Sequence, residues 1–566
     1  MIRSVFRPFS RAVVSFFCAA AVLAGGAWAS ARAAEPTVLG IVAVDGYADL
    51  KKQLGWLGGQ IGQPGLAAVA ESLLMVATQG RGLAGLDVSR PLGVIVTASG
   101  PLPLVHGYVP VKNIDKLLES LQGTLGPADR DGDARRVTLP SGATIEFVEK
   151  ATPNGAWAIA SLPGMPATID DPMPLLERVV GPFSIGVNLF PSAMPEPIRQ
   201  QLEMILDQAA AAAAAQGQEI DPATVRGFIA NLAETESFAL GMAIDAAEKQ
   251  VFVETSSSLV EGSMTAQSMA AAAEGVLTVG TPATAEGRRP MLRGHVVQKL
   301  SAEMQAQITK SFDATLEKEA DDRLVASLGD AARSLLGAIL GAGGVEAAVF
   351  MDAGRATAAK PLPEITLGMR IKDGKALEGR LKELFGRRDA LPAGIKVAFD
   401  TGTAGAATLH TITLDLDGTP AEEKLGGTVD LTLAVSPEFA FVLAGGDVKQ
   451  RAQEALAASG KPDASAKPIA SLQAAVDGVL AYAAASGEGG EAAQAKKAAE
   501  AAREAGGGTL EVAVKPIERG VATRLSVDAA GLRAAAAMAN GGQPAGPQGG
   551  GLVPLPQGFP IPVPVR

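Results

Sequence analysis

Two stretches of this sequence recur once along the chain, and this recurrence constrains the fold more than any other feature. The stretch at residues 102–121 returns 260 residues later, so that Leu117 corresponds to Leu377. A second stretch matches without a gap at an offset of 270 residues, which places Leu240 against Leu510. Because the matches keep the same order, we expect two tandem copies of one folding unit. Chance similarity between segments of low complexity is the alternative.

Each copy combines strands with helices. Residues 38–44 have the character of a strand, and from Leu300 to Leu328 apolar residues recur at every fourth position, which is typical of a long amphipathic helix. The stretches 238–255 and 509–527 read as antiparallel hairpins around short polar turns. The sequence therefore predicts the α+β class, with two tandem copies of a mostly antiparallel sheet and helices packed on one face.

Composition divides the chain into five parts. We predict a signal peptide at 1–34, a first α+β unit at 35–278, a linker of small residues at 279–287, a second unit at 288–540 and a disordered tail at 541–566. The tail carries seven prolines in a Gly/Gln setting, which favours a flexible or polyproline II segment. A binding motif in the tail stays open.

The first residues predict export. Arg3, Arg7 and Arg11 are followed by an apolar stretch at 12–27 and by an Ala-x-Ala cleavage pattern at 31–33. The apolar stretch is shorter than the roughly 20 residues that a membrane-spanning helix needs. We therefore expect a cleaved signal peptide, no membrane span in the mature chain, and a periplasmic or secreted protein.

Cysteine content and charge exclude several functions. Cys18 is the only cysteine and lies in the predicted signal peptide, so the mature chain can form no disulfide, thiolate nucleophile, zinc–thiolate site or iron–sulfur cluster. Removal of four arginines with the signal peptide takes the formal net charge from −11 to −15. Because such a charge repels phosphate backbones, we expect no nucleic-acid partner.

A short motif at residues 85–91, Gly-Leu-Asp-Val-Ser-Arg-Pro, follows an expected helix and precedes an expected strand. In this setting it resembles uncharacterised exported bacterial α+β proteins of unknown function. The resemblance covers about a third of the chain and implies no catalytic residue. The corresponding stretch of the second copy lacks the Asp-x-x-Arg-Pro pattern, so we interpret Asp87 and Arg90 as a local pair that closes the turn.

Histidines give no catalytic signature. The chain has three, His106, His295 and His410, each in an expected strand, and none is matched by a histidine in the other copy. We interpret them as core or face-lining residues with a backbone partner. Residues 181–186 place a serine near two glycines, but one position late for a nucleophile elbow, so this stretch predicts a turn followed by a strand.

Acidic residues at alternate positions in 129–133 resemble a calcium loop, but Gly and Glu are missing from the places that an EF-hand requires. A turn before a strand is the simpler interpretation. We therefore nominate no catalytic, cofactor-binding or metal-binding residue and expect no cofactor.

Three functions stay open on the sequence. The first is a non-enzymatic exported protein of structural, scaffolding or interaction type in the cell envelope, with a protein partner. The second is a periplasmic carrier of a lipid or other apolar ligand, and the third is a hydrolase with an unrecognised site. Because no set of polar residues with a catalytic pattern is found in the sequence, the non-enzymatic protein is favoured.

The export prediction can be checked on the purified protein. Cell fractionation followed by N-terminal sequencing should place the mature start near Ala34 or Glu35, because the cleavage pattern ends there. Recovery of an intact Met1 in a cytoplasmic protein would contradict it.

Overall fold

The computed structural model describes residues 37–539 except 99–102, 140, 166–168, 201–203, 205–207, 209–232, 284–288, 319–322, 355–361, 387–393, 420–421, 426, 463–468 and 488. The predicted signal peptide and tail lie outside the described residues. Twenty strands of the described part form one sheet, accompanied by thirteen α-helices. Every strand pairing is antiparallel, and the predicted α+β class with a mostly antiparallel sheet is confirmed.

The first half of the chain supplies ten strands. They are β1 (Thr37–Val44), β2 (Leu92–Ala98), β3 (Pro103–Val111), β4 (Ala128–Asp131), β5 (Ala134–Thr138), β6 (Thr144–Thr152), β7 (Gly155–Ser161), β8 (Ile185–Leu189), β9 (Thr235–Asp245) and β10 (Gln250–Leu259). The described helices of this half are α2 (Tyr47–Gln60), α3 (Leu66–Ala77), α4 (Ile114–Leu125), α5 (Met173–Val180) and α8 (Met264–Ala273), with a 3-10 turn at Pro191–Ala193. In space the strands are ordered β4-β5-β6-β7-β3-β2-β1-β8-β9-β10.

The second half supplies the other ten. They are β11 (Leu292–Lys299), β12 (Gly344–Asp352), β13 (Glu364–Arg370), β14 (Ile395–Ala404), β15 (Ala407–Asp415), β16 (Thr428–Val435), β17 (Phe439–Ala444), β18 (Ala470–Ala475), β19 (Thr509–Ile517) and β20 (Gly520–Asp528). The described helices are α9 (Ala302–Lys318), α10 (Arg323–Leu340), α11 (Gly374–Gly386), α12 (Glu422–Leu425), α13 (Val448–Ala458), α14 (Val476–Ser486), α15 (Gly489–Glu504) and α16 (Ala529–Ala539). The spatial order is β14-β15-β16-β17-β13-β12-β11-β18-β19-β20.

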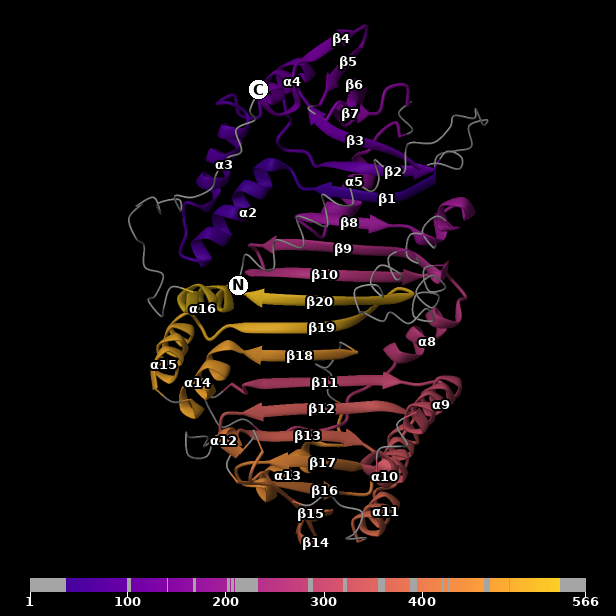
Figure 1. Ribbon diagram of the computed structural model, residues 1–566, viewed down its shortest axis with the longest axis vertical. Coiled ribbons are helices and arrows are strands. Elements are labelled where there is room, and N and C mark those ends of the chain that lie inside the picture. The colour runs from indigo at the N-terminus through magenta and orange to yellow at the C-terminus, as the bar shows by residue number, and fades with distance from the viewer. Residues whose placement is uncertain are drawn as a thin grey trace.

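One strand pair joins the two halves. β10 lies antiparallel to β20 from Gln250–Asp528 to Ser258–Gly520, so that the sheet continues without a break along the long axis of the molecule (Figure 1). From this pair outward both halves have the same strand order, and among the described strands β4 and β14 alone are edges. The sheet is therefore open rather than closed into a barrel. Within the described residues, no helix combines the length and apolar character that a membrane crossing requires.

The strand registers relate the halves residue by residue. Gly107 of β3 and Leu367 of β13 are 260 residues apart in the sequence. When the strand pairings are followed from these two residues across their own halves of the sheet, they lead to residues of β10 and β20 that are 270 residues apart. Glu254 and Arg524 are 270 residues apart and lie opposite each other in the central pair. A rotation of 180° about an axis that passes through this pair, perpendicular to the sheet, therefore exchanges the strand positions of the two halves.

The pair at the centre of this rotation is charged. Arg524 Nε lies 2.6 Å from Glu254 Oε2, and its guanidinium carbon lies 4.0 Å from the centre of the Phe252 ring. In a symmetric dimer of two identical chains, this position would hold the same residue from both chains, so that two equal charges would face each other. A single chain can place a carboxylate opposite a guanidinium, which stabilises the junction.

Helix starts obey the offset of 260 residues as well. Asn113 accepts a hydrogen bond from the backbone N–H of Lys116 at the start of α4, and Asp373 accepts one from Ala376 at the start of α11. Side-chain caps of this kind satisfy backbone donors that a helix leaves free. One turn further on, Leu117 and Leu377 are both buried.

The ungapped match of the two hairpins is wrong by two residues. Leu240 pairs with Thr255, whereas Leu510 pairs with Val527. By strand register, the counterpart of Leu240 is Val512. The reason is the turn: four residues separate the last pair of β9 and β10, but only two separate that of β19 and β20.

Helices cover the sheet unevenly. Near its ends both faces are covered: α5 packs on Trp157 and α4 on Phe147 in the first half, while α13 and α11 pack on opposite faces in the second. At the centre the faces differ. On β19, Val512 is 37% exposed and the adjacent Ala513 is 4% exposed. We call the face of Val512 the open face and that of Ala513 the covered face.

The charged junction can be tested by substitution. Arg524→Glu places two carboxylates opposite each other on partly buried strands, and we expect it to lower the free energy of unfolding by about 2 kcal/mol or more. The swap Glu254→Arg with Arg524→Glu restores the attraction and should recover most of that loss. Urea unfolding at pH 7 measures both, and a swap as unstable as the single variant would contradict the role of the pair.

Candidate functional site

A row of apolar side chains crosses the open face at right angles to the strands. Consecutive members are direct partners in the strand registers, so they follow one line across seven strands. We call this row the apolar strip; its members, from β10 to β13, are Val253, Leu525, Val512, Leu472, Gly294, Val349 and Leu367.

The strip is exposed where the sheet is least covered. Leu525, Leu472 and Leu367 are 44%, 43% and 42% exposed, and Leu510, beside the strip, is 40% exposed. Large contiguous apolar patches are uncommon on soluble proteins and mark sites of binding. Six strand spacings of about 4.8 Å make the strip about 29 Å long.

Polar groups lie on the other side of the same strands. Arg524 and Glu254 form their ion pair on the covered face, and Gln473 Nε2 donates to Glu511 Oε1 at 3.0 Å. The central strands thus depart from the usual arrangement, in which apolar residues are covered and polar residues face solvent: the covered face holds these polar pairs beside buried apolar residues such as Phe252 and Ala513, while the open face is apolar. Stability alone does not favour this distribution, because Leu and Val side chains that stay about 40% exposed gain only part of the free energy of full burial.

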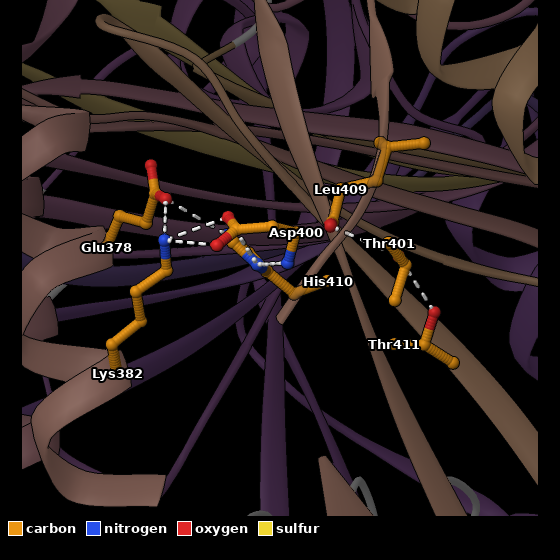
Figure 2. Close-up of polar contacts among 7 residues, drawn as sticks. All are labelled: Glu378, Lys382, Asp400, Thr401, Leu409, His410 and Thr411. Carbon is orange, nitrogen blue, oxygen red and sulfur yellow. Dashed lines mark hydrogen bonds and ion pairs between the residues drawn. The ribbon is translucent and has the colours of Figure 1, made fainter. Parts of the chain in front are cut away.

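A second feature is a cluster of titratable groups between α11 and the β14–β15 hairpin. Lys382 Nζ lies 2.7 Å from Glu378 Oε1 and 2.8 Å from Asp400 Oδ1, so the ammonium bridges both carboxylates (Figure 2). The buried His410 accepts a hydrogen bond on Nδ1 from the backbone N–H of Asp400 at 3.2 Å. Its Nε2 points toward Glu378 at 3.7 Å.

Sequence and backbone together build this cluster. Glu378 and Lys382 are one helical turn apart on α11, and His410 points inward from β15. Asp400 has a left-handed backbone, with φ of 55°, at an irregularity of the β14 register. The i,i+4 pair was visible in the sequence, whereas the bulge that brings Asp400 to it was not.

Glu378, Asp400 and His410 have the donor types of a metal site, and within the described residues they form the single group close enough to share an ion. Two observations oppose a metal there. Lys382 already supplies a cation to both carboxylates. His410 Nδ1 is an acceptor, so the proton of the neutral ring is on Nε2, which a metal bound at that atom would have to displace. The cluster thus ties α11 to the hairpin by ion pairs.

Electrostatics follow from these contacts. Burial lowers the pKa of His410, and Glu378 acts in the opposite direction. Lys382 donates hydrogen bonds to the carboxylates of Asp400 and Glu378, which raises the pKa of Lys382, and the same bond lowers the pKa of Asp400. The ring is therefore neutral at neutral pH, beside one ammonium and two carboxylates.

The other two histidines lie far apart along the sheet. His106 is fully buried on β3, with its ring centre 6.4 Å from that of Tyr108. His295 is on β11, where Nδ1 lies 3.0 Å from Ser471 Oγ. The expected backbone partner is confirmed for His410. The structure brings no two of the three histidines together in one site.

Asp87 and Arg90 form the local pair that the motif at 85–91 predicts. Arg90 Nε donates to Asp87 Oδ2 at 2.9 Å, and its other nitrogens donate to the carbonyls of Asn154 and Ala156. Burial would raise the pKa of Asp87, but the hydrogen bonds from Ser89 and Arg90 outweigh it and lower the pKa. The pair closes its turn and fastens it to the β6–β7 hairpin.

The remaining candidates are structural. Ser184 is buried before β8 and accepts a hydrogen bond on Oγ from the backbone N–H of Ile244, as expected for a turn followed by a strand. The acidic stretch at 129–133 forms the end of β4 and the exposed two-residue turn at 132–133 that leads into β5, and Asp131 pairs with Arg136 at 2.7 Å. The turn interpretation is confirmed for 181–186, whereas in 129–133 only residues 132–133 form the turn because residues 129–131 belong to β4.

His410 generates a pH prediction. Because its pKa is lowered in the folded state, its contribution to stability is complete above the unfolded pKa of about 6.5 and is lost as pH falls from there through the folded pKa. His410→Gln should lower stability by on the order of 1 kcal/mol at pH 7 and flatten the pH dependence below about pH 6.5. Urea unfolding across this range measures both, and an unchanged slope would refute the assignment. Because no histidine is nominated as catalytic, His106→Gln and His410→Gln should leave cellular function intact.

Comparisons of this chain with protein families, with curated proteins and with solved structures find no match. The function must therefore be inferred from the residues of this chain. Among the features above, the apolar strip is the one that folding alone does not account for.

Proposed function

We propose that this protein is an exported, non-enzymatic binding protein of the cell envelope and that the apolar strip holds acyl chains of a lipid. The observation that carries the proposal is the alignment of exposed leucines and valines along one line of the open face. Export rests on the predicted signal peptide, and the tandem repeat is supported by the shared strand order of the two halves.

The composition of the strip favours a lipid over a protein partner. Binding hot spots between proteins are enriched in Trp, Tyr and Arg, and the strip contains only Val, Leu and Gly. Its length of about 29 Å matches the roughly 30 Å hydrocarbon thickness of a bilayer, which two acyl chains span end to end.

The open geometry predicts reversible binding. A buried methylene contributes about 0.8 kcal/mol, and an open face covers only one side of a chain. Contact with about 15 methylenes would then give on the order of 6 kcal/mol, which corresponds to dissociation constants of tens of micromolar. Such affinity suits a protein that takes up and passes on its ligand.

The hydrolase alternative has less support. Within the described residues the histidines are separated, Ser184 is engaged with the backbone, and the His410 cluster is held by Lys382. His295 Nδ1 lies 3.0 Å from Ser471 Oγ, but within the described residues no carboxylate lines the cavity that holds this pair, so a third group to orient the imidazole is missing from it.

Substitutions on the strip test the proposal. The triple variant Leu472→Thr, Val512→Thr and Leu525→Thr keeps strand propensity but makes the strip polar. It should weaken binding of palmitate, measured by displacement of a fluorescent fatty acid, by at least tenfold. Because the positions are exposed, stability should change by no more than about 0.5 kcal/mol per site.

Ile517→Thr serves as the matched control, since Ile517 is an exposed apolar residue at the end of β19 that is not in the strip. It should bind palmitate as the wild type does. Undiminished binding by the triple variant would refute the strip as the lipid site. Wild-type protein that binds no palmitate, but carries a protein partner through these residues, would replace the lipid with a protein partner.

A further inference from the structure

A cavity of about 390 Å³ lies on the covered face at β11 and β18. Its floor carries Arg293 and His295, two positions apart on β11, and Ser471, the register partner of His295 on β18. Residues two apart on a strand point to the same side, about 7 Å from each other. The remaining wall is mostly apolar, with Leu277, Val279, Ala348, Ala458 and Pro462.

A segment of extended chain forms the roof. Leu277 and Val279 are buried in the core of the second half, and the backbone N–H groups of Thr278 and Val279 donate to the carboxylate of Glu346. Gly280 N–H donates to Ser459 Oγ at 2.9 Å. A side chain on Gly280 would start 2.4 Å from the carbonyl oxygen of Ala455, so only glycine fits this close approach.

Charge distinguishes this cavity from its surroundings. Arg293 and Lys461 both line it, and neither has an ion pair with a described residue. No Asp or Glu of the described part lines the cavity. The nearby carboxylate of Glu346 is occupied by the roof, with further bonds to Thr278 Oγ1 at 2.7 Å and Arg370 at 3.5 Å. Two cations with no ion pair among the described residues thus meet at one cavity in a chain of net charge −11, and this arrangement favours an anionic ligand.

We propose that this cavity binds a phosphate group. Arg293 provides a planar guanidinium and Lys461 an ammonium, while His295 and the hydroxyl of Ser471 supply further polar contacts. The apolar wall leaves room for a small organic group attached to the phosphate. Free phosphate and the headgroup of an anionic phospholipid share this chemistry. The polar groups of this site are on the face opposite the apolar strip. Gly294 and Val349 of the strip also line the cavity, but Leu472, Val512 and Leu525, the positions substituted to test the strip, do not.

Calorimetry tests the proposal with two probes: inorganic phosphate, and vesicles of phosphatidylglycerol and phosphatidylcholine with pure phosphatidylcholine vesicles as the blank. Arg293→Gln and Lys461→Gln should each weaken binding of the recognised probe by about tenfold, since each removes one charge-assisted contact. Both residues are exposed, so the variants should unfold at the wild-type temperature in buffer without phosphate.

Lys396→Gln is the control of equal charge change, because Lys396 is exposed on β14 at the edge of the sheet and does not line the cavity. It should bind as the wild type does. Binding of inorganic phosphate identifies the free ion as sufficient, and binding of the anionic vesicles alone identifies a headgroup. No binding of either probe by the wild type, or an equal loss in Lys396→Gln, would overturn the site. Neither result bears on palmitate binding by the strip.

Discussion

The antiparallel pairing of β10 with β20 is the contact on which the rest of the structure depends. Each half ends its strand order at this pair, and without it both halves would expose an unpaired sheet edge in the middle of the chain. Exposed edges invite aggregation. Covalent linkage of the halves lets Glu254 face Arg524 at the position where two identical chains would place equal charges. The junction is therefore matched in charge as well as in hydrogen bonding.

Continuity of the sheet also creates the apolar strip. Val253 comes from the first half and the other members from the second, so the row exists only because the central strands pair in this register. A shift of one residue would turn the row to the covered face. The open sheet has room for a long ligand but does not enclose it, which favours exchange over storage.

The sequence predicts some of these features and not others. Helix caps at Asn113 and Asp373 and the buried Leu117 and Leu377 obey the 260-residue offset, because local signals set them. The register of the hairpins does not obey the sequence offset, because the turn between β19 and β20 is two residues shorter than the turn between β9 and β10 and this shifts one strand of the hairpin by two residues. The apolar strip could not be predicted from the sequence. The alternation of apolar and polar residues within each strand was visible, but the order of the strands in space was not. The His410 cluster was half visible, because the bulge at Asp400 has no sequence signature here.

The central claim is that the open face of the joined sheet is the binding surface. Methyl NMR of protein labelled at Leu and Val, with a nitroxide-bearing fatty acid added, tests it most directly. Signals of Leu472, Val512 and Leu525 should broaden first, while those of the buried Leu377 on α11 should stay sharp. Broadening centred on residues of the covered face, with these three unaffected, would contradict it.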